Sequence, residues 1–479
     1  MRIAFRLPCL FLMIGLCLTA CVTAGPDYQT PVLETPASWK RLDPAVADGR
    51  VEAPDQWWRK FNEPLLSALV EEALVSSPDL LSARARLRQA RAHRAMAAAG
   101  YFPEVSVSGS AGRSRSSEAA GSGNTVERYA AGFDAGWELD VFGGVRRGVE
   151  AAAADLAATE AALEDVRVTL AAEVARYYIE INSLRIQRDL VRANLASQAE
   201  TLQLTEWRAQ AGLVSRQDVD QARGNYEQTR ARLPMLEISL AEAEHGLDIL
   251  LGRMPGALHD RLMATSGLPE PPTDIAVGIP AEALRRRPDV RAAERALAAE
   301  TARVGVAQAN RYPSFRLSGS IGLEALTFGD LSGGDAAAGS LLAGISAPIF
   351  KAGELRRQVE AQDAVREQAR IAYEQTVRQA LGEVENALVA LAADRERTTA
   401  LAAAAEAIRS AARLARQRYG SGLIDFSSVL ETERSLLSVE ESLTDARTDK
   451  LLSLIRLYKA LGGGWSPPTE ADQTPEERP

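Results

Sequence analysis

Four short segments of the chain alternate apolar and polar residues, the pattern of β-strands with two different faces. The clearest is 128–141, where Tyr129, Phe133 and Trp137 fall on one face and Asp134 on the other. The other three contain Val105 and Val107, Phe315 and Leu317, and Leu341 and Ala343. Each segment is close to the roughly 9–11 residues of a tilted transmembrane strand. Strands of a soluble β-sandwich alternate in the same way, so the pattern alone leaves both environments open.

Four strands are too few to enclose a membrane barrel. About eight strands are the minimum for a closed barrel, and an open sheet edge is not tolerated in lipid. If these strands span a membrane, several copies of the chain must share one barrel.

Two long intervals without proline predict very long helices. They lie between Pro103 and Pro234 and between Pro348 and Pro467. Each can hold a helix of roughly 65 residues, about 100 Å long at 1.5 Å per residue. Shorter helical stretches, rich in Ala and Arg, are expected at 62–100 and 280–310.

Heptad rows of apolar residues follow the long helices and predict coiled-coil packing. In the first half of the chain the row is Val219, Tyr226, Leu233, Leu240 and Leu247. In the second half it is Val429, Leu436, Leu443 and Leu457. An isolated antiparallel hairpin would give the same rows. Pro234 interrupts the first row, and we expect a local kink there.

Each long helix should turn back at a short loop centred on glycine, because glycine supplies the positive φ that ends a helix. The two loops are expected to form hairpin tips, with Ser215 and Asp425 as candidate caps of the following helices. The tip residues are Gly212, Leu213 and Val214 in the first loop and Gly422, Leu423 and Ile424 in the second.

The chain contains an internal duplication with a constant spacing of 210 residues. Pro78-Asp79-Leu80 recurs as Pro288-Asp289-Val290, and Ser108-Gly109-Ser110 recurs as Ser318-Gly319-Ser320. The tips and the heptad rows obey the same spacing. Two structurally equivalent halves are therefore expected.

Composition excludes several classes of function. The 479 residues carry a net charge of −9 and have a mean hydropathy of −0.14, which argues against a nucleic-acid partner and against a helical polytopic membrane protein. The three cysteines all lie within the first 21 residues, and the three histidines, His93, His245 and His259, have no metal-binding spacing. We expect no cofactor, no metal and no enzymatic activity.

The first 20 residues have the features of an export signal. Arg2 and Arg6 precede an apolar run that is short for a membrane span. The sequence Leu18-Thr19-Ala20-Cys21 looks like a bacterial lipobox, so Cys21 is the expected lipidation site. An ordinary signal peptide with a cysteine at its boundary is the alternative. An Asp after the lipidated cysteine favours the inner membrane, so Val22 fits the outer membrane.

These features together resemble the TolC-like outer-membrane efflux channels, specifically the lipoprotein branch called NodT or OprM type. The residues that carry the resemblance are Cys21 with Gly25-Pro26-Asp27-Tyr28, the pair Trp57-Trp58, the duplication, both tips, and the closing Tyr458-Lys459-Ala460-Leu461-Gly462-Gly463-Gly464-Trp465. The resemblance implies a mainly α fold with membrane β-strands: a trimeric 12-stranded β-barrel continued by a long α-helical coiled-coil barrel.

The resemblance also divides the chain. The expected parts are a signal peptide (1–20), an N-terminal equatorial segment (21–61), a first repeat (62–252), an equatorial linker (253–279), a second repeat (280–462) and a tail rich in Pro and Glu (463–479). The first repeat would contain strands 103–116 and 128–141, a long helix 145–211 and a return helix 217–252. The second would contain strands 313–328 and 338–350, a long helix 354–419 and a return helix 426–462.

The implied function is a passive exit duct in the outer membrane, gated at its periplasmic tip. The implied partners are two further copies of the chain, a periplasmic adaptor, an inner-membrane RND-type pump and outer-membrane lipid. Family members close the tip with polar residues nine and twelve positions beyond the second tip glycine, which here are Glu431 and Arg434. Ser427 occupies a place where a leucine constricts some relatives. An ordinary exposed pair three residues apart is the alternative for Glu431 and Arg434.

A periplasmic adaptor or scaffold lipoprotein built on helical hairpins is the second candidate. Adaptors also carry lipoboxes and coiled coils, but they have one hairpin flanked by β segments. The two hairpins and two strand pairs of this chain, at one constant spacing, favour the channel.

Overall fold

The computed structural model describes residues 23–40, 55–119, 123–264, 267–272 and 280–465. The chain forms two compact units. Of the described residues, the first contains those within 1–32, 86–160 and 292–374, and the second contains those within 33–85, 161–291 and 375–479. Each unit draws segments from both repeats, because the long helices pass from one unit to the other.

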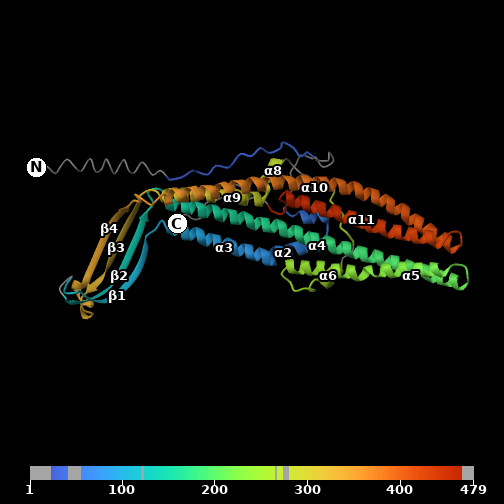
Figure 1. Ribbon diagram of the computed structural model, residues 1–479, viewed down its shortest axis with the longest axis horizontal. Helices are drawn as coiled ribbons and strands as arrows, with labels where there is room; N and C mark the ends of the chain where they lie inside the picture. Colours follow the sequence, from blue (N-terminus) through green and yellow to red (C-terminus); the bar gives the residue numbers. More distant parts are fainter. Residues whose placement is uncertain (1–22, 41–54, 120–122, 265–266, 273–279, 466–479) are drawn as a thin grey trace. The chain divides into compact units, whose positions relative to one another are not determined.

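The first unit contains one antiparallel sheet with the strand order β1-β2-β3-β4 (Figure 1). The strands are β1 (Glu104–Arg115), β2 (Thr125–Leu139), β3 (Ser314–Ala325) and β4 (Ala337–Ser346). The expected ends differ from these at several places. β4 stops at Ser346 and not at residue 350, because Pro348 cannot donate to the ladder. β3 stops at Ala325, and two short 3-10 turns, η3 (Gly329–Ser332) and η4 (Gly334–Ala336), fill the connection.

The register of the sheet keeps apolar and polar residues on opposite faces. Phe133 pairs with Val107 on one side and Ile321 on the other. The next residue, Asp134, pairs with Ser106 and Ser320 on the opposite face. The apolar face is solvent-exposed, with Ile321 70% exposed. Within the described residues, β1 and β4 each have a neighbour on one side only.

Four helices continue from the strands. α3 (Pro78–Ala99) and α9 (Pro288–Ala309) lead into β1 and β3, and α4 (Gly144–Gln210) and α10 (Glu354–Gly420) follow β2 and β4. α4 and α10 contain 67 residues each. The first backbone N–H groups of α4 are capped by Asp140, whose Oδ1 accepts from Val145 N (3.0 Å) and whose Oδ2 accepts from Arg146 N (2.8 Å). α10 has Phe350 at the equivalent place, 210 residues on.

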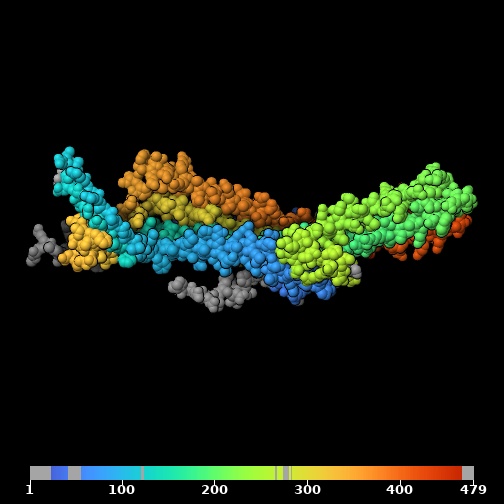
Figure 2. All heavy atoms as spheres, turned by 90° about the horizontal axis from the view of Figure 1, so that it is seen from below, coloured from blue at the N-terminus to red at the C-terminus, as the bar shows by residue number. Residues whose placement is uncertain are grey.

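The return helices of the second unit differ between the repeats. α11 (Phe426–Ala460) is continuous, whereas the single helix expected at 217–252 is two helices, α5 (Arg216–Arg230) and α6 (Arg232–Leu250). The break is one residue, Ala231, just before the expected kink at Pro234. Proline has no N–H to donate to the preceding turn, and it is tolerated in the first turn of a new helix. Figure 2 shows α5 and α6 (green to yellow-green) as one continuous ridge.

The predicted heptad rows are mostly buried in the second unit, with Tyr226 and Leu233 only partly buried. Val219, Leu240 and Leu247 of the first row are at most 7% exposed, and all four members of the second row are at most 8% exposed. Val191 and Leu195 of α4 pack with Leu437 of α11 in the same core. The rows therefore pack against the long helices.

The shorter elements of the second unit close its core. They are η2 (Trp57–Phe61), α2 (Pro64–Ser76), α7 (His259–Met263) and α8 (Pro280–Arg286). Each expected Ala- and Arg-rich stretch is split before a proline, Pro78 or Pro288. The Trp57 ring stacks on that of Tyr458, with centroids 5.3 Å apart.

None of the described helices combines the length and the apolar composition that a membrane-spanning helix needs. In the same part of the chain, no group of three or more His, Cys, Asp or Glu side chains is arranged to hold a metal ion.

Candidate functional site

Both predicted tips are tight turns closed by main-chain hydrogen bonds. Gly212 has a φ of 74° and Gly422 a φ of 75°, the left-handed conformation that ends a helix. Leu213 N donates to Arg208 O at 2.8 Å, and Leu423 N donates to Arg418 O at 2.9 Å. These bonds satisfy carbonyls that the helix ends leave free, so the two tips have the same rigid shape.

The tips present apolar side chains to solvent. Leu213 is 70% exposed and Leu423 is 72% exposed. Ser215 caps α5 in a capping box with Asp218, as predicted. The corresponding prediction for Asp425 is wrong, because its side chain makes no capping hydrogen bond to α11.

An arginine that sequence reasoning missed joins the two tips. Arg208, in the last turn of α4, donates from Nη1 to the main-chain oxygen of Tyr419 in α10 at 2.7 Å. Its guanidinium also lies over the Tyr419 ring, 4.6 Å from the centroid. The Tyr419 hydroxyl is 3.1 Å from Thr205 Oγ1. The sequence does contain a signal for this contact: residue 419 is a tyrosine, whereas the equivalent residue of the first repeat is Ala209.

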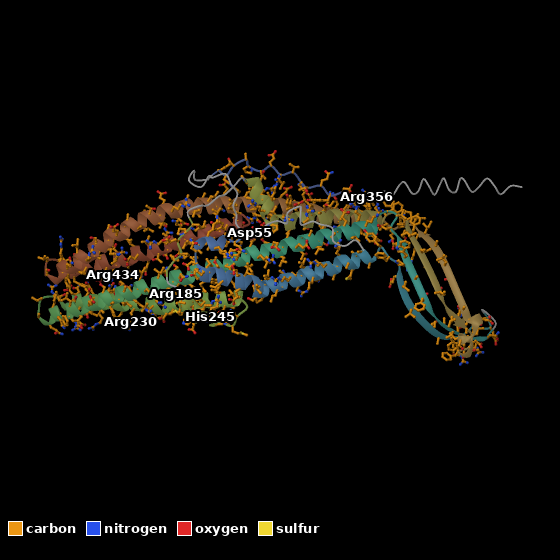
Figure 3. All side chains as sticks on the ribbon, turned by 180° about the vertical axis from the view of Figure 1, so that it is seen from behind. Asp55, Arg185, Arg230, His245, Arg356 and Arg434 are labelled. Atoms are coloured by element: carbon orange, nitrogen blue, oxygen red, sulfur yellow. The ribbon has the colours of Figure 1, made fainter. Side chains whose placement is uncertain are left out.

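The three candidate gate residues line one groove. Ser427, Glu431 and Arg434 of α11 face Gln221, Gly224 and Asn225 of α5 across it. Figure 3 labels Arg434 on α11. Ser427, Glu431 and Arg434 are all solvent-exposed.

Arg434 links the two walls of this groove. Its Nε donates to Asn225 Oδ1 at 2.9 Å, so an uncharged partner on α5 fixes the guanidinium. Sequence reasoning missed Asn225, because the repeat places Ser435 at the equivalent position and gives no signal for an amide.

A buried carboxylate lies between the candidate gate residues in the sequence of α11. Glu433 is 2% exposed and accepts from Thr201 Oγ1 of α4 at 3.3 Å. Arg416 of α10 lies 3.4 Å away, Nε to Oε1. Burial raises the pKa of the Glu433 carboxyl, and the charge of Arg416 opposes this shift. Glu433 thus contacts both long helices at the level of the gate residues.

The polar face of the sheet carries charges of both signs. A hollow on this face is lined by Glu104, Asp134 and Arg316 together with serines of β1, β3 and β4. Ser108 Oγ donates to Asp134 Oδ2 at 2.6 Å, and Arg128 pairs with Glu324 at 3.2 Å. Such a face is suited to water and not to hydrocarbon.

The candidate lipidation site, Cys21, lies outside the described residues, as do the signal peptide and the tail from residue 466 on. The described chain begins two residues after Cys21, at Thr23.

Comparison with known proteins agrees with this architecture. The profile of the family described as "Outer membrane efflux protein" matches residues 69–253 and 279–463, once in each repeat. Pyoverdine export outer membrane protein OpmQ of Pseudomonas putida is 34% identical over 463 residues, covering 95% of this chain and 97% of that protein. Nodulation protein T of Rhizobium leguminosarum bv. trifolii is 32% identical over 473 residues, covering 95% and 97%.

Solved structures show the same fold. The outer-membrane channel OprN superposes with a TM-score of 0.85 at 36% identity, over 92% of this chain and 99% of that chain. The open state of the MtrE outer membrane channel of Neisseria gonorrhoeae gives a TM-score of 0.80 at 27% identity, over 92% and 98%. The matches cover both repeats, which an adaptor with one hairpin would not. The chain belongs to the outer membrane efflux protein family: it is an outer-membrane efflux channel protein with a duplicated, TolC-like fold.

Proposed function

We propose that this protein is the passive exit duct of a tripartite efflux system and that it acts as a homotrimer. The sheet supports this proposal most directly. It has one exposed apolar face, one polar face with charges, and two strands, β1 and β4, with one neighbour each among the described residues. Three such sheets, joined β4 to β1, give a closed barrel of twelve strands whose apolar face meets lipid and whose polar face meets water.

The helical part supports the same proposal. A helix of 67 residues is about 100 Å long, so α4 and α10 have the length to carry a tube from the outer membrane far into the periplasm. The sequence has no ATP-binding motif, which fits a passive duct. The driving force comes from an inner-membrane pump of the RND type.

The tips are the proposed contact with a periplasmic adaptor. Gly212, Leu213 and Val214 and their equivalents Gly422, Leu423 and Ile424 present two rigid turns of the same shape, each with an exposed leucine. Apolar side chains on a preorganised turn suit a partner that recognises the turn by the complementary shape of its own surface. Cys21 is the proposed lipid anchor in the outer membrane.

Glu431, Arg434 and Ser427 are the proposed gate. They line a groove next to the tip, and Arg434 is held by Asn225. Closure by polar side chains that are bound to a neighbouring helix can be reversed by a small movement of α5 against α11.

The cargo is set by the pump and not by the duct. Relatives are named for the export of pyoverdine, for toluene and antibiotic efflux and for cation efflux, so channels similar to this one serve chemically unrelated cargoes. The mixed charges on the polar face of the sheet are consistent with a water-filled passage of low selectivity.

The experiment that tests this proposal is mass determination and single-particle electron microscopy of the protein extracted from the outer membrane in detergent. A three-fold hollow particle with a protein mass near three times 51.5 kDa supports it. A monomer, or a particle without a central passage, overturns it. Restoration of drug resistance in a strain that lacks its own exit duct then tests the assignment to efflux.

A further inference from the structure

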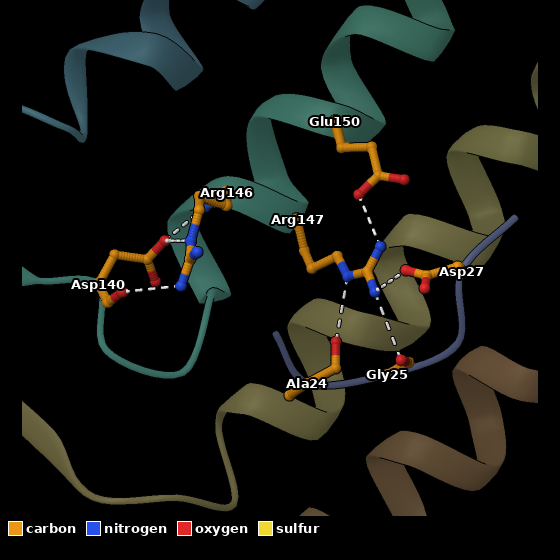
Figure 4. Close-up of polar contacts among 7 residues, drawn as sticks. All are labelled: Ala24, Gly25, Asp27, Asp140, Arg146, Arg147 and Glu150. Carbon is orange, nitrogen blue, oxygen red and sulfur yellow. Dashed lines mark hydrogen bonds and ion pairs between the residues drawn. The ribbon is translucent and has the colours of Figure 1, made fainter. Parts of the chain in front are cut away.

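The segment just after Cys21 is bound tightly to the first unit. Arg147, at the start of α4, is only 4% exposed because this segment covers it (Figure 4). Its Nε donates to Ala24 O at 3.1 Å, and its Nη2 donates to Asp27 Oδ1 at 2.6 Å and to Gly25 O at 3.4 Å. Nη1 donates to Glu150 on the same helix at 2.8 Å. One guanidinium therefore holds three residues of the segment, Ala24, Gly25 and Asp27.

The segment crosses α9 at a contact between two glycines. A Cβ placed on Gly25 would lie 2.3 Å from Gly305 Cα, and one placed on Gly305 would lie 2.9 Å from Ala24 O. Gly25 also has a φ of 92°. Only glycine at both positions allows the two backbones to come this close.

Further contacts fix the segment on both sides of the crossing. Ala24 N donates to Phe142 O at 3.0 Å, which ties the segment to the turn between β2 and α4. Tyr28 donates to Glu294 of α9 at 3.2 Å, and burial raises the pKa of the tyrosine to about 12. The motif Gly25-Pro26-Asp27-Tyr28, which the sequence singled out without a role, thus makes its contacts with α4 and α9.

The duplication shows that these features serve the segment and not the helices. Arg357 and Glu360 are the equivalents of Arg147 and Glu150, and they form the same pair on α10. There, however, the Arg357 side chain is 78% exposed, and none of the described segments covers it. The equivalent of Gly305 in the first repeat is Ala95. The glycine and the buried arginine occur together only where the N-terminal segment lies.

We propose that Arg147, Gly305 and the motif at residues 25–28 form a latch that docks the N-terminal segment and fixes the place where the lipid on Cys21 enters the bilayer. This inference rests on the proposed lipidation. Cys21 is three residues from Ala24, and three residues of extended chain span about 10 Å at most. The latch therefore confines the acyl chains to the immediate neighbourhood of the turn between β2 and α4. Without it, the free tether would extend to Tyr28 or beyond.

Hydrogen–deuterium exchange of the full-length protein, purified from the outer membrane in detergent, tests the latch. The readout is the exchange rate of the peptide that covers residues 23–30. We expect it to rise about tenfold or more in Arg147→Ala and in Gly305→Ala. Arg357→Ala and Ala95→Gly are the matched controls, because they change the equivalent positions, where none of the segments that the structure describes is docked. Their exchange should equal that of the wild type.

Gly305→Ala is the most discriminating variant. Alanine favours a helix more than glycine does, so this change should strengthen α9, while its Cβ displaces both the segment at Ala24 O and the Arg147 side chain that holds it. Asp27→Asn lies on the segment itself, leaves the residues of α4 and α9 unchanged and should give a smaller rise. Peptides from α10 in the same samples report whether the fold is intact. A rise of equal size in the controls, or no rise in Arg147→Ala and Gly305→Ala, overturns the proposal.

Two further measurements distinguish a failure of the latch from a failure of the proposed lipidation. They are the intact mass of the mature protein and the exchange of residues 23–30 in a Cys21→Ser variant. If the mature protein carries no acyl mass, the role of the latch in placing a lipid fails. If the acyl mass is present and Cys21→Ser still protects residues 23–30, the latch forms independently of the lipid, as proposed. Loss of protection in Cys21→Ser shows that the lipid holds the segment, and this result also overturns the latch.

Discussion

Arg416 of α10 and Glu433 of α11 form an ion pair at the positions where the first repeat has Glu206 and Arg223, so the duplication has kept the pair and exchanged its charges. In the second repeat, Arg416 Nε lies 3.4 Å from Glu433 Oε1. In the first repeat, Arg223 Nη2 lies 2.9 Å from Glu206 Oε1. The environments differ: the Glu433 side chain is 3% exposed, whereas those of Arg223 and Glu206 are 53% and 30% exposed. The two pairs lie at equivalent positions of the two hairpins, and they differ in the solvent exposure of their side chains.

The two pairs should therefore respond differently to the loss of the arginine. Arg223→Ala should cost about 0.2–1 kcal/mol of unfolding free energy, because its partner Glu206 remains in contact with water. Arg416→Ala should cost more, about 1–3 kcal/mol, because it leaves a buried carboxylate without a cation. Thermal unfolding in detergent, followed by circular dichroism, compares them. Equal losses would show that burial does not decide the strength of these pairs.

Glu433 should make stability depend on pH. Burial raises the pKa of its carboxyl above the usual 4.5, so the folded protein binds this proton more tightly than the unfolded chain does. The resulting stabilisation is fully present below the unfolded pKa and is lost as the pH rises through the folded pKa. We expect the Tm of Glu433→Gln, relative to that of the wild type, to increase over this interval. Glu206→Gln, at the exposed pair, is the control, and a parallel trend in both variants would refute the assignment.

Asp140 should stabilise the start of α4. Its carboxylate accepts two main-chain hydrogen bonds and also contacts Arg146 Nε at 3.3 Å. Asp140→Ala should cost about 1 kcal/mol, as the loss of a helix cap does, and should speed amide exchange in the first turn of α4. Arg146→Ala removes the side-chain contact but keeps the main-chain bonds, so it should have the smaller effect. The opposite order would assign the stabilisation to the ion pair.

Gly252 and Gly462 should not tolerate a side chain. They have φ values of 72° and 73°, and a Cβ would lie 2.9 Å from Ser76 O in the first case and 3.0 Å from Arg286 O in the second. Alanine at either position should cost about 1–2 kcal/mol from the left-handed conformation alone, and the close carbonyl adds to that cost. Gly224→Ala in α5 is the control, because open space surrounds a Cβ there. It should be neutral or stabilising in the same unfolding measurement.

Removal of the proposed gate should make the outer membrane permeable. Glu431→Ala with Arg434→Ala removes the charged side chains of the groove and the bond to Asn225. We expect increased sensitivity to vancomycin and a higher conductance of the purified protein in planar bilayers. Arg230→Ala is the control, because Arg230 is an exposed arginine of α5 that pairs with Glu227 at 2.9 Å. Unchanged permeability of the double variant would remove these residues from the gate.

Local patterns predicted most of the fold. Period-two alternation identified the strands, the proline-free intervals identified α4 and α10, and glycines at 212 and 422 marked the tips, because each of these signals acts over a few neighbouring residues. The one-residue break at Ala231 was expected only as a kink, since periodicity continues across it. Asp425 has the right residue type for a cap, but side-chain geometry decides whether the bond forms.

Contacts between distant residues could not be predicted in this way. Arg147 and Asp27 are 120 residues apart, and Arg208 and Tyr419 are 211 residues apart, so no local pattern connects them. Comparison of the two repeats does give a signal. Gly305 opposite Ala95, and Tyr419 opposite Ala209, mark places where one copy of the duplicated unit meets something that the other copy does not.

The two outer strands of the sheet have a kinetic consequence for biogenesis. A row of main-chain donors and acceptors without partners costs several kilocalories per mole for each group in hydrocarbon, and in water it pairs readily with any other strand. If the barrel is shared by three chains as proposed, a newly exported chain therefore cannot enter the bilayer alone and is at risk of aggregation while it waits. Insertion of the proposed trimer must be coupled to association, so its rate should rise steeply with the number of chains delivered to the same patch of membrane. Periplasmic chaperones that cover β1 and β4 should limit the losses.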